Sequence, residues 1–137
     1  MAFKIQRVDY FHLTLKDQPG EAYKFLSTLA NAGLNLFAFT AIPLGGDCTQ
    51  LTVFPEDSLA LGKIAKFNKL NMDGPHRALL ASGDDELGAL AKIHMKLYQA
   101  GVNVSASTGV ADGKEGYGYI LYIRSDEYEK AVKALDI

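Results

Sequence analysis

The spacing of apolar residues changes along this chain, and each change marks a predicted element. Residues 8–15 are rich in β-branched and aromatic side chains, which predicts a strand ending at a Pro-Gly break. Apolar residues then recur at the spacing of a helix, at Ala22, Phe25, Leu26, Leu29 and Ala30. The pattern next predicts a strand at 34–42, a turn at 43–47, a strand at 48–54 and a helix at 57–69.

The second half of the chain has the same order of patterns. It predicts a strand at 76–82, a helix within 84–101, a strand at 102–110, a turn at 111–116, a strand at 117–124 and a helix at 126–135. Gly33 and Gly101 follow the long helix of each half, where a left-handed residue commonly ends a helix. Asp57 or Ser58 suits the N-cap of the helix at 57–69.

An internal repeat accounts for this common order. Residues 17–42 and 85–110 align without a gap at an offset of 68, and nine aligned positions are identical. Chance would give about two identities at average residue frequencies. The alignment therefore indicates a duplicated unit of about 68 residues.

The order β-α-β-β-α, occurring twice, predicts an α+β protein. We expect two ferredoxin-like βαββα(β) modules, at 1–72 and 73–137, with antiparallel sheets and the helices on one face. A fourth strand of the first module fits only into 68–73. The second module has no residues for one, and a long first strand starting at Phe3 could take that place.

The sheet face without helices is expected to carry apolar residues. The candidates are Phe37 and Phe39 in the first module or Tyr117, Tyr119 and Leu121 in the second, and the pattern leaves open which alternate set faces the helices. A module of this size is marginal alone. Burying an aromatic side chain contributes roughly 1.5–3 kcal/mol. We therefore expect the modules to pair and the chain to form a homodimer or a larger oligomer.

Composition excludes several classes of function. The net charge is −2 and the cations are scattered, which argues against a nucleic-acid partner. No apolar run approaches the ~18 residues of a membrane span, and the start of the chain does not resemble a signal peptide. Cys48, the single cysteine, excludes an internal disulfide and is compatible with a reducing cytosol. We expect a cytoplasmic protein with no membrane partner.

The motif Asp17-Gln18-Pro19-Gly20, followed thirteen residues after its glycine by Ala-Gly-Leu-Asn-Leu, resembles the ACT domain. Two such units with little else resemble the small stand-alone proteins made of tandem ACT domains. The resemblance covers nearly the whole chain. It implies a non-catalytic regulatory or sensor protein that binds a small molecule, usually an amino acid, at an interface between modules. Any output would then pass through a regulated partner protein or through assembly.

In the ACT family the ligand commonly lies between the loop before the first helix and the start of the following strand. Carried over by position, the resemblance implies ligand-binding residues Asp17, Gln18, Pro19, Gly20, Asn35 and Phe37 in the first unit, and Asp85, Glu86, Leu87, Gly88, Asn103 and Ser105 in the second. The second unit departs from the motif because Leu87 replaces the proline, so its loop could have another shape. Phe37 is also replaced by Ser105, which would make one site more apolar than the other.

Elementary chemistry supports a site at these loops. A helix N-terminus favours negative charge by ~0.3–1 kcal/mol, and a free amino acid carries a carboxylate. Asn35 and Asn103 each offer a donor and an acceptor for its polar groups. A purely structural interpretation remains open, in which Asp17 and Asp85 cap the helices and the asparagines bond the turns.

Two other functions remain open. Residues 9–25 faintly resemble the opening of the glyoxalase and dioxygenase metalloenzymes, with His12 as a metal ligand. That family has β-α-β-β-β modules without a second helix, and Leu80 occupies the position of His12 in the second unit. His94 is expected to lie half-buried on a helix, and no two histidines have the close spacing of metal ligands. The other alternative is an interaction module that binds no ligand. We expect no catalytic residues, no cofactor and no metal, because no nucleophile, base and orienting group stand out together.

Overall fold

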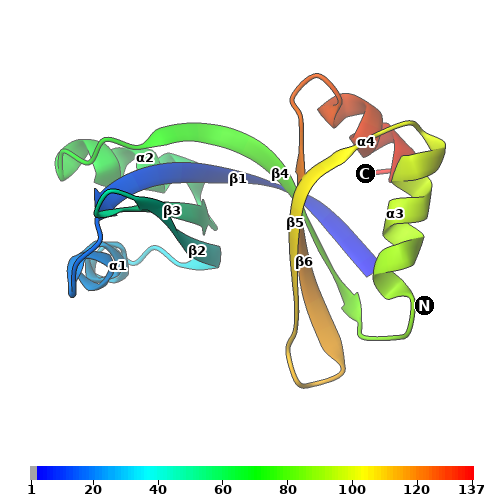
Figure 1. Cartoon of the computed structure of the whole chain (residues 1–137), viewed down its shortest axis with the longest axis horizontal. Helices are drawn as coiled ribbons and strands as arrows, with labels where there is room; N and C mark the ends of the chain where they lie inside the picture. Colours follow the sequence, from blue (N-terminus) through cyan, green and yellow to red (C-terminus); the bar gives the residue numbers. More distant parts are fainter. Residues whose placement is uncertain (1–2) are drawn as a thin grey trace. The chain divides into compact units, whose positions relative to one another are not determined.

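The computed structural model describes residues 3–137, which form six strands and four helices. The elements are β1 (Phe3–Lys16), α1 (Glu21–Asn31), β2 (Leu36–Gly45), β3 (Cys48–Pro55), α2 (Ser58–Phe67), β4 (Asp73–Asp84), α3 (Ala89–Gln99), β5 (Val104–Ala111), β6 (Gly116–Ile123) and α4 (Tyr128–Ala134) (Figure 1). The predicted element types and their order are confirmed, and the protein is α+β.

The described residues divide into two compact units, and each has a ferredoxin-like arrangement. Asp9–His76 form one unit, and Arg77–Ile137 form the other together with the start of β1 up to Val8. The strand order is β2-β3-β1-β4-β6-β5, in which β1 and β4 each supply residues to both units. β3 pairs antiparallel with β1 and β2, and β6 pairs antiparallel with β4 and β5.

The fourth strand of each unit comes from the other half of the chain. In the unit Arg77–Ile137, residues 3–8 of β1 lie next to β4, which agrees with the expectation of a long first strand from Phe3. Ile5 belongs to the core of that unit. In the unit Asp9–His76, the fourth strand is the beginning of β4 from Asp73 and not the segment 68–73.

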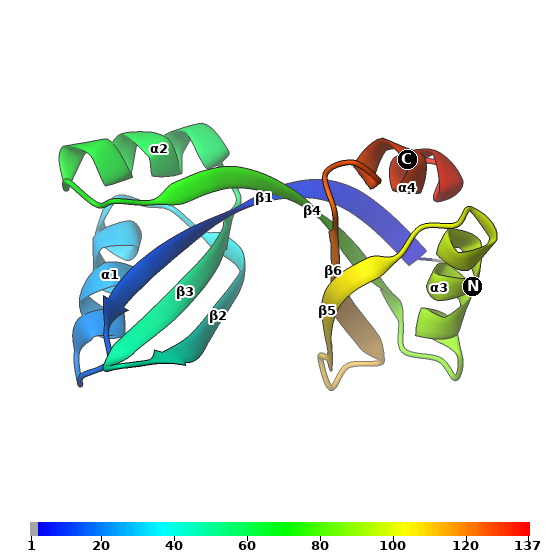
Figure 2. The ribbon, with the colours of Figure 1, turned by 45° about the horizontal axis from the view of Figure 1, so that its top comes forward.

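Both helices of each unit lie on one face of its strands (Figure 2). The core of the unit Asp9–His76 joins α1, α2, β1 and β3 through Phe11, Leu13, Phe25, Leu29, Leu51, Val53 and Leu61. In the other unit Ile93 and Leu97 of α3 and Val132 of α4 pack on β4 and β6. Burial of apolar side chains between helices and sheet is the main stabilising term in each unit.

The structure decides which alternate residues face the helices. Tyr117, Tyr119 and Leu121 belong to the helix-facing core, so they are not on the open face. Phe39 also packs against the core of its unit. Phe37 lies at an irregularity in the register of β2 with β3 and is 41% exposed. The open faces carry other residues, among them His12 and Thr52, because neighbouring strand residues point to opposite faces.

The helix ends are specified by local sequence. Gly33 and Gly101 adopt the expected left-handed backbone, with φ of 77° and 72°. Asp57 caps α2, since its Oδ1 accepts a hydrogen bond from the Ala60 N–H at 3.1 Å. The expectation that Asp17 and Asp85 cap the other long helices is wrong. The N-cap positions of α1 and α3 are glycines, and no side chain caps either helix.

Substitution of Gly20 tests the left-handed backbone at the start of α1, where φ is 90°. Gly20→Ala should lower the free energy of unfolding by about 1–2 kcal/mol, because a Cβ destabilises this conformation. The matched control is Gly62→Ala inside α2, where an added Cβ meets no atom within 4 Å. The control should raise the free energy of unfolding by about 0.5–1 kcal/mol. Urea denaturation measures both, and equal effects in the two variants would contradict this account.

Candidate functional site

The loops that precede α1 and α3 have the same geometry. The Asp17 N–H donates to the Asp47 carbonyl at 2.7 Å, and the Asp85 N–H donates to the Glu115 carbonyl at 2.7 Å. The residue before each helix is a left-handed glycine, with φ of 90° and 81°. Leu87 therefore does not change the shape of the second loop, although Pro19 stands at its position in the first. The hydrogen bonds and the glycines specify the loop, and the proline is dispensable.

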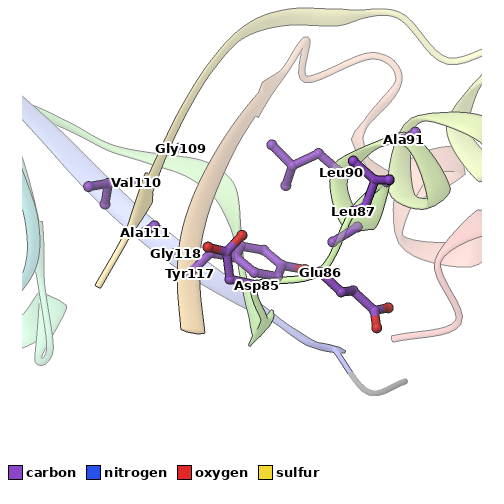
Figure 3. Close-up of a pocket in the computed structure, with 12 residues that line it drawn as sticks. Asp85, Glu86, Leu87, Leu90, Ala91, Gly109, Val110, Ala111, Tyr117 and Gly118 are labelled. Atoms are coloured by element: carbon purple, nitrogen blue, oxygen red, sulfur yellow. The ribbon is translucent and has the colours of Figure 1, made fainter. Parts of the chain in front are cut away.

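A cavity of about 670 Å³ lies between the second loop, the first turn of α3 and the strands β5 and β6 (Figure 3). Its lining is mainly apolar. The residues that line it are Asp85, Glu86, Leu87, Gly88, Ala89, Leu90, Ala91, Gly109, Val110, Ala111, Tyr117 and Gly118. The volume lies within the range of ordinary small-molecule pockets.

The backbone at one end of this cavity suits a negatively charged group. The first four N–H groups of a helix lack partners within the helix, and no side chain caps α3. Leu90 and Ala91 lie in this first turn and line the cavity. The helix dipole adds partial positive charge at the same place.

Tyr117 is the most informative residue of the lining. It is only 9% exposed, and within residues 3–137 its buried hydroxyl makes no hydrogen bond. Burial raises the pKa of Tyr117 above its ordinary value, and the negative charges of Glu86 and Asp84 raise it further. The hydroxyl therefore remains protonated at neutral pH and can donate a hydrogen bond. A buried polar group without a partner is costly, so this group favours a ligand that supplies one.

Carboxylates occur at the mouth of the same cavity. Glu86 forms an ion pair with Lys92, with 3.1 Å between Oε1 and Nζ. Asp85 makes no ion pair in the described part of the chain, so its carboxylate can pair with a cationic group of a ligand. The cavity thus combines a site for an anion, a buried donor and a negative charge within one unit.

The structure brings together only part of the expected second site. Asp85, Glu86, Leu87 and Gly88 line the cavity, whereas Asn103 and Ser105 do not belong to its lining. Asn103 is exposed, and its backbone N–H donates to Oε1 of Glu127 at 3.4 Å.

The expected site residues of the first unit are all at the surface. Asp17, Gln18, Pro19 and Gly20 are exposed, and Phe37 is partly so. Asn35 is exposed as well, and its side-chain amide donates to Oε2 of Glu56 at 3.3 Å. In each unit the asparagine therefore bonds a glutamate that precedes the next helix. Two cavities of this unit lie elsewhere, one between α1 and α2 and one beside His12.

Sequence reasoning missed the residues that β5 and β6 contribute, including Tyr117, Val110 and Gly118. They are far from the loop in sequence and reach it only through the pairing of β4, β5 and β6. The sequence contained one signal for this cavity. Gly118 has no side chain, whereas the residue aligned with it in the first half is Gln50. An added Cβ at Gly118 meets no atom within 4 Å.

The metal-enzyme alternative lacks support in this geometry. His12 Nδ1 and Thr52 Oγ1 share a hydrogen bond of 3.0 Å. Among the described residues there is no group of three or more His, Cys, Asp or Glu side chains placed to hold a metal ion. Both units also contain a second helix, α2 or α4, which the β-α-β-β-β module of that family does not have.

No helix within residues 3–137 is long and apolar enough to cross a membrane.

Comparison with solved structures shows which known folds the chain resembles. The first is protein BT0572 from Bacteroides thetaiotaomicron, with 20% identity and a TM-score of 0.80 over 96% of this chain and 88% of that one. The ligand-free regulatory subunit of aspartate kinase from Thermus thermophilus has 14% identity and a TM-score of 0.65, over 99% and 96% of the two chains. The corresponding regulatory subunit from Thermus flavus has 16% identity and a TM-score of 0.57, over 98% and 94%.

These likenesses show that the chain has the fold of such regulatory subunits over nearly its whole length. No protein-family model matches the sequence, and a comparison with curated proteins gives no match.

Substitution of two tyrosines of β6 tests whether the buried Tyr117 hydroxyl lacks a hydrogen-bond partner. Tyr117→Phe should leave the free energy of unfolding unchanged or raise it by about 1 kcal/mol, because it removes a buried donor without a partner. Tyr119→Phe is the matched control, since the Tyr119 hydroxyl bonds His94 Nε2 at 2.6 Å. The free energy of unfolding of Tyr119→Phe should fall by about 1 kcal/mol. Thermal unfolding without ligand compares them, and a larger loss in Tyr117→Phe would contradict the assignment.

Proposed function

We propose that this chain is a tandem ACT-type regulatory or sensor protein that binds a free amino acid and catalyses no reaction. In this proposal residues 1–72 and 73–137 are two copies of one module. The likeness to regulatory subunits of aspartate kinase supports the class of protein. The observation that carries the proposal is the cavity at α3, which is lined both by Tyr117, whose buried hydroxyl has no partner among the described residues, and by the first turn of an uncapped helix.

A zwitterionic amino acid fits the charges of this cavity. Its carboxylate would accept hydrogen bonds from the N–H groups of Leu90 and Ala91 and from the Tyr117 hydroxyl. Its ammonium group would pair with Asp85, whose carboxylate is free of ion pairs within the described residues. A simple anion would gain from the helix N-terminus but would be repelled by Asp85 and Glu86. The charge pattern therefore favours a ligand that carries both signs.

The apolar part of the lining favours an apolar ligand side chain. Leu87 is fully exposed and Val110 is 70% exposed, although both lie at the cavity. A ligand side chain that covers them would remove apolar surface from water. We infer that aliphatic amino acids bind more tightly than acidic or basic ones.

A regulatory role without catalysis agrees with the chemistry of the lining. Its titratable side chains are Asp85, Glu86 and Tyr117, and it contains no serine, cysteine, histidine or lysine. A nucleophile with an adjacent base is therefore not available in this cavity. The proposal requires a regulated partner protein or a change of assembly to transmit the binding signal.

The proposal includes a cytoplasmic homodimer in which a module of a second copy completes the binding site. The edge strand β5 ends the strand order, and every residue after Val104 in this strand is exposed. Light scattering should therefore detect a species of twice the chain mass. The fraction of this dimer should rise when the amino acid binds, because a ligand that contacts both copies stabilises their association. A monomer at every protein concentration would exclude the interface arrangement.

A thermal-shift screen against the twenty amino acids tests the proposed function. A ligand at 100 times its dissociation constant should stabilise the folded chain by about 2.7 kcal/mol, which corresponds to several degrees in melting temperature. We expect the hits among aliphatic amino acids. If no amino acid changes the melting temperature, the alternative of an interaction module without a ligand is favoured.

Variants then locate the ligand. Tyr117→Phe should weaken binding about threefold to tenfold, the effect of losing one hydrogen bond. Gly118→Val should weaken it further by filling the cavity. Asn103→Ala is the matched control. The resemblance to the ACT domain implies that Asn103 contacts the ligand, but Asn103 is not part of the cavity lining. A loss of binding in Asn103→Ala with none in Tyr117→Phe would assign the ligand to the site expected from the sequence instead.

A further inference from the structure

The unit Asp9–His76 contains a second cavity of a different character. Its volume is about 390 Å³, and six of its eight lining residues have polar side chains. The lining residues are His12, Leu13, Thr14, Gln50, Lys69, Leu70, Asn71 and Asp73. They come from β1, from Gln50 on the neighbouring strand β3, from the segment between α2 and β4, and from the first residue of β4. Neither the resemblance to ACT domains nor the proposed amino-acid cavity involves these residues.

Lys69 is the only cation of this lining. It makes no ion pair among the residues that the structure describes. Its backbone is left-handed, with φ of 56°, at the second position after α2. Glycine is the usual residue at this position, because a Cβ there is unfavourable. The chain therefore places a lysine at the cavity at a conformational cost.

Neutral donors line the same cavity as the lysine. The side-chain amides of Gln50 and Asn71 and the hydroxyl of Thr14 each offer N–H or O–H groups. Asp73 is the one carboxylate of the lining, and its Oδ2 lies 3.1 Å from His76 Nε2. The lining therefore carries one lysine and one carboxylate, and Lys69 and Asp73 form no ion pair with each other among the described residues.

His12 is the lining residue whose protonation state can change with pH near neutrality. The titratable and charged groups around it are Tyr10 on β1, Asp73 and His76 on β4, and Lys69 after α2. Burial lowers the pKa of His12, the neighbouring His76 lowers it further, and Asp73 opposes these effects. His12 is therefore a neutral donor or acceptor near neutral pH. A bound anion would favour its protonated form and raise its pKa.

We propose that this cavity is a second small-molecule site that binds an oxyanion, a carboxylate or phosphate group, through the Lys69 ammonium and the amides of Gln50 and Asn71. The anion takes up a proton at His12 when it binds, so its affinity increases as the pH is lowered. This site is independent of the amino-acid cavity, because the residues that line the two cavities belong to different units.

Titration with inorganic phosphate and, separately, with acetate tests the proposal. Nuclear magnetic resonance of the full chain, at an ionic strength held constant with chloride, should show shifts at Gln50, Lys69, Asn71 and the His12 ring. Affinity should be higher at about pH 5.5 than at about pH 7.5, on the two sides of the ordinary histidine pKa. Binding of phosphate alone or of acetate alone would identify which oxyanion the site accepts.

Lys69→Gly is the decisive variant because it keeps the backbone that this position requires. It should retain or raise the melting temperature while the affinity for the anion falls at least about tenfold, the effect of losing a charged hydrogen-bond donor. Asp136→Gly is the matched control, since Asp136 has the same left-handed backbone after α4, with φ of 59°. That variant should leave anion affinity unchanged.

Three results would overturn the proposal. They are the absence of shifts at the four residues with either anion, unchanged affinity in Lys69→Gly, and shifts confined to the first turn of α3. The last result would assign anion binding to the amino-acid cavity. Loss of amino-acid binding in Tyr117→Phe would not affect the anion site, so the two proposals fail independently.

Discussion

The structure depends on two long strands, β1 and β4, that each supply residues to both compact units. A unit of this size needs a four-stranded sheet under its two helices, because fewer strands would leave much of its apolar helix surface in water. Each half of the sequence supplies two complete strands and the larger part of a third to its own unit, and the other half supplies the fourth. Ile5 shows the consequence, since it comes from the beginning of the chain and lies in the core of the unit Arg77–Ile137. The beginning of β1 and the beginning of β4 therefore each belong to the unit that the other half mainly forms.

Within this common framework the two halves have similar loops and different surfaces. The loops before α1 and α3 share backbone hydrogen bonds and left-handed glycines, although only one contains a proline. The divergence lies in the strands that face them. Gly118 and Tyr117 stand where the first half has Gln50 and Thr49, and an open cavity with a buried hydroxyl results. Two units with the same loop can thus differ in their cavities, because the residues that hold the loop differ from the residues that shape the cavity.

The cavities of the two units are lined by different kinds of side chain. One cavity combines an uncapped helix N-terminus with apolar walls and carboxylates, the features on which the proposed amino-acid ligand rests. The other combines a lysine with amides and an imidazole, which suits an oxyanion. His12 belongs to the second environment, where Thr52 and His76 are its neighbours. Leu80 occupies the aligned position in the other half, so this environment was not duplicated.

The sequence by itself determined the elements, their order and the α+β class, because these depend on local apolar spacing and on glycines that end helices. It also identified the loop Asp85–Gly88, since the motif repeats at a constant offset. It did not reveal that Asp17 and Asp85 leave their helices uncapped, or that Tyr117 faces the helices. Only the tertiary structure decided that Tyr117 and Val110 reach the loop while Asn103 does not. The physical reason is that strand register and the source of the fourth strand depend on contacts between residues far apart in the chain, which local patterns do not specify.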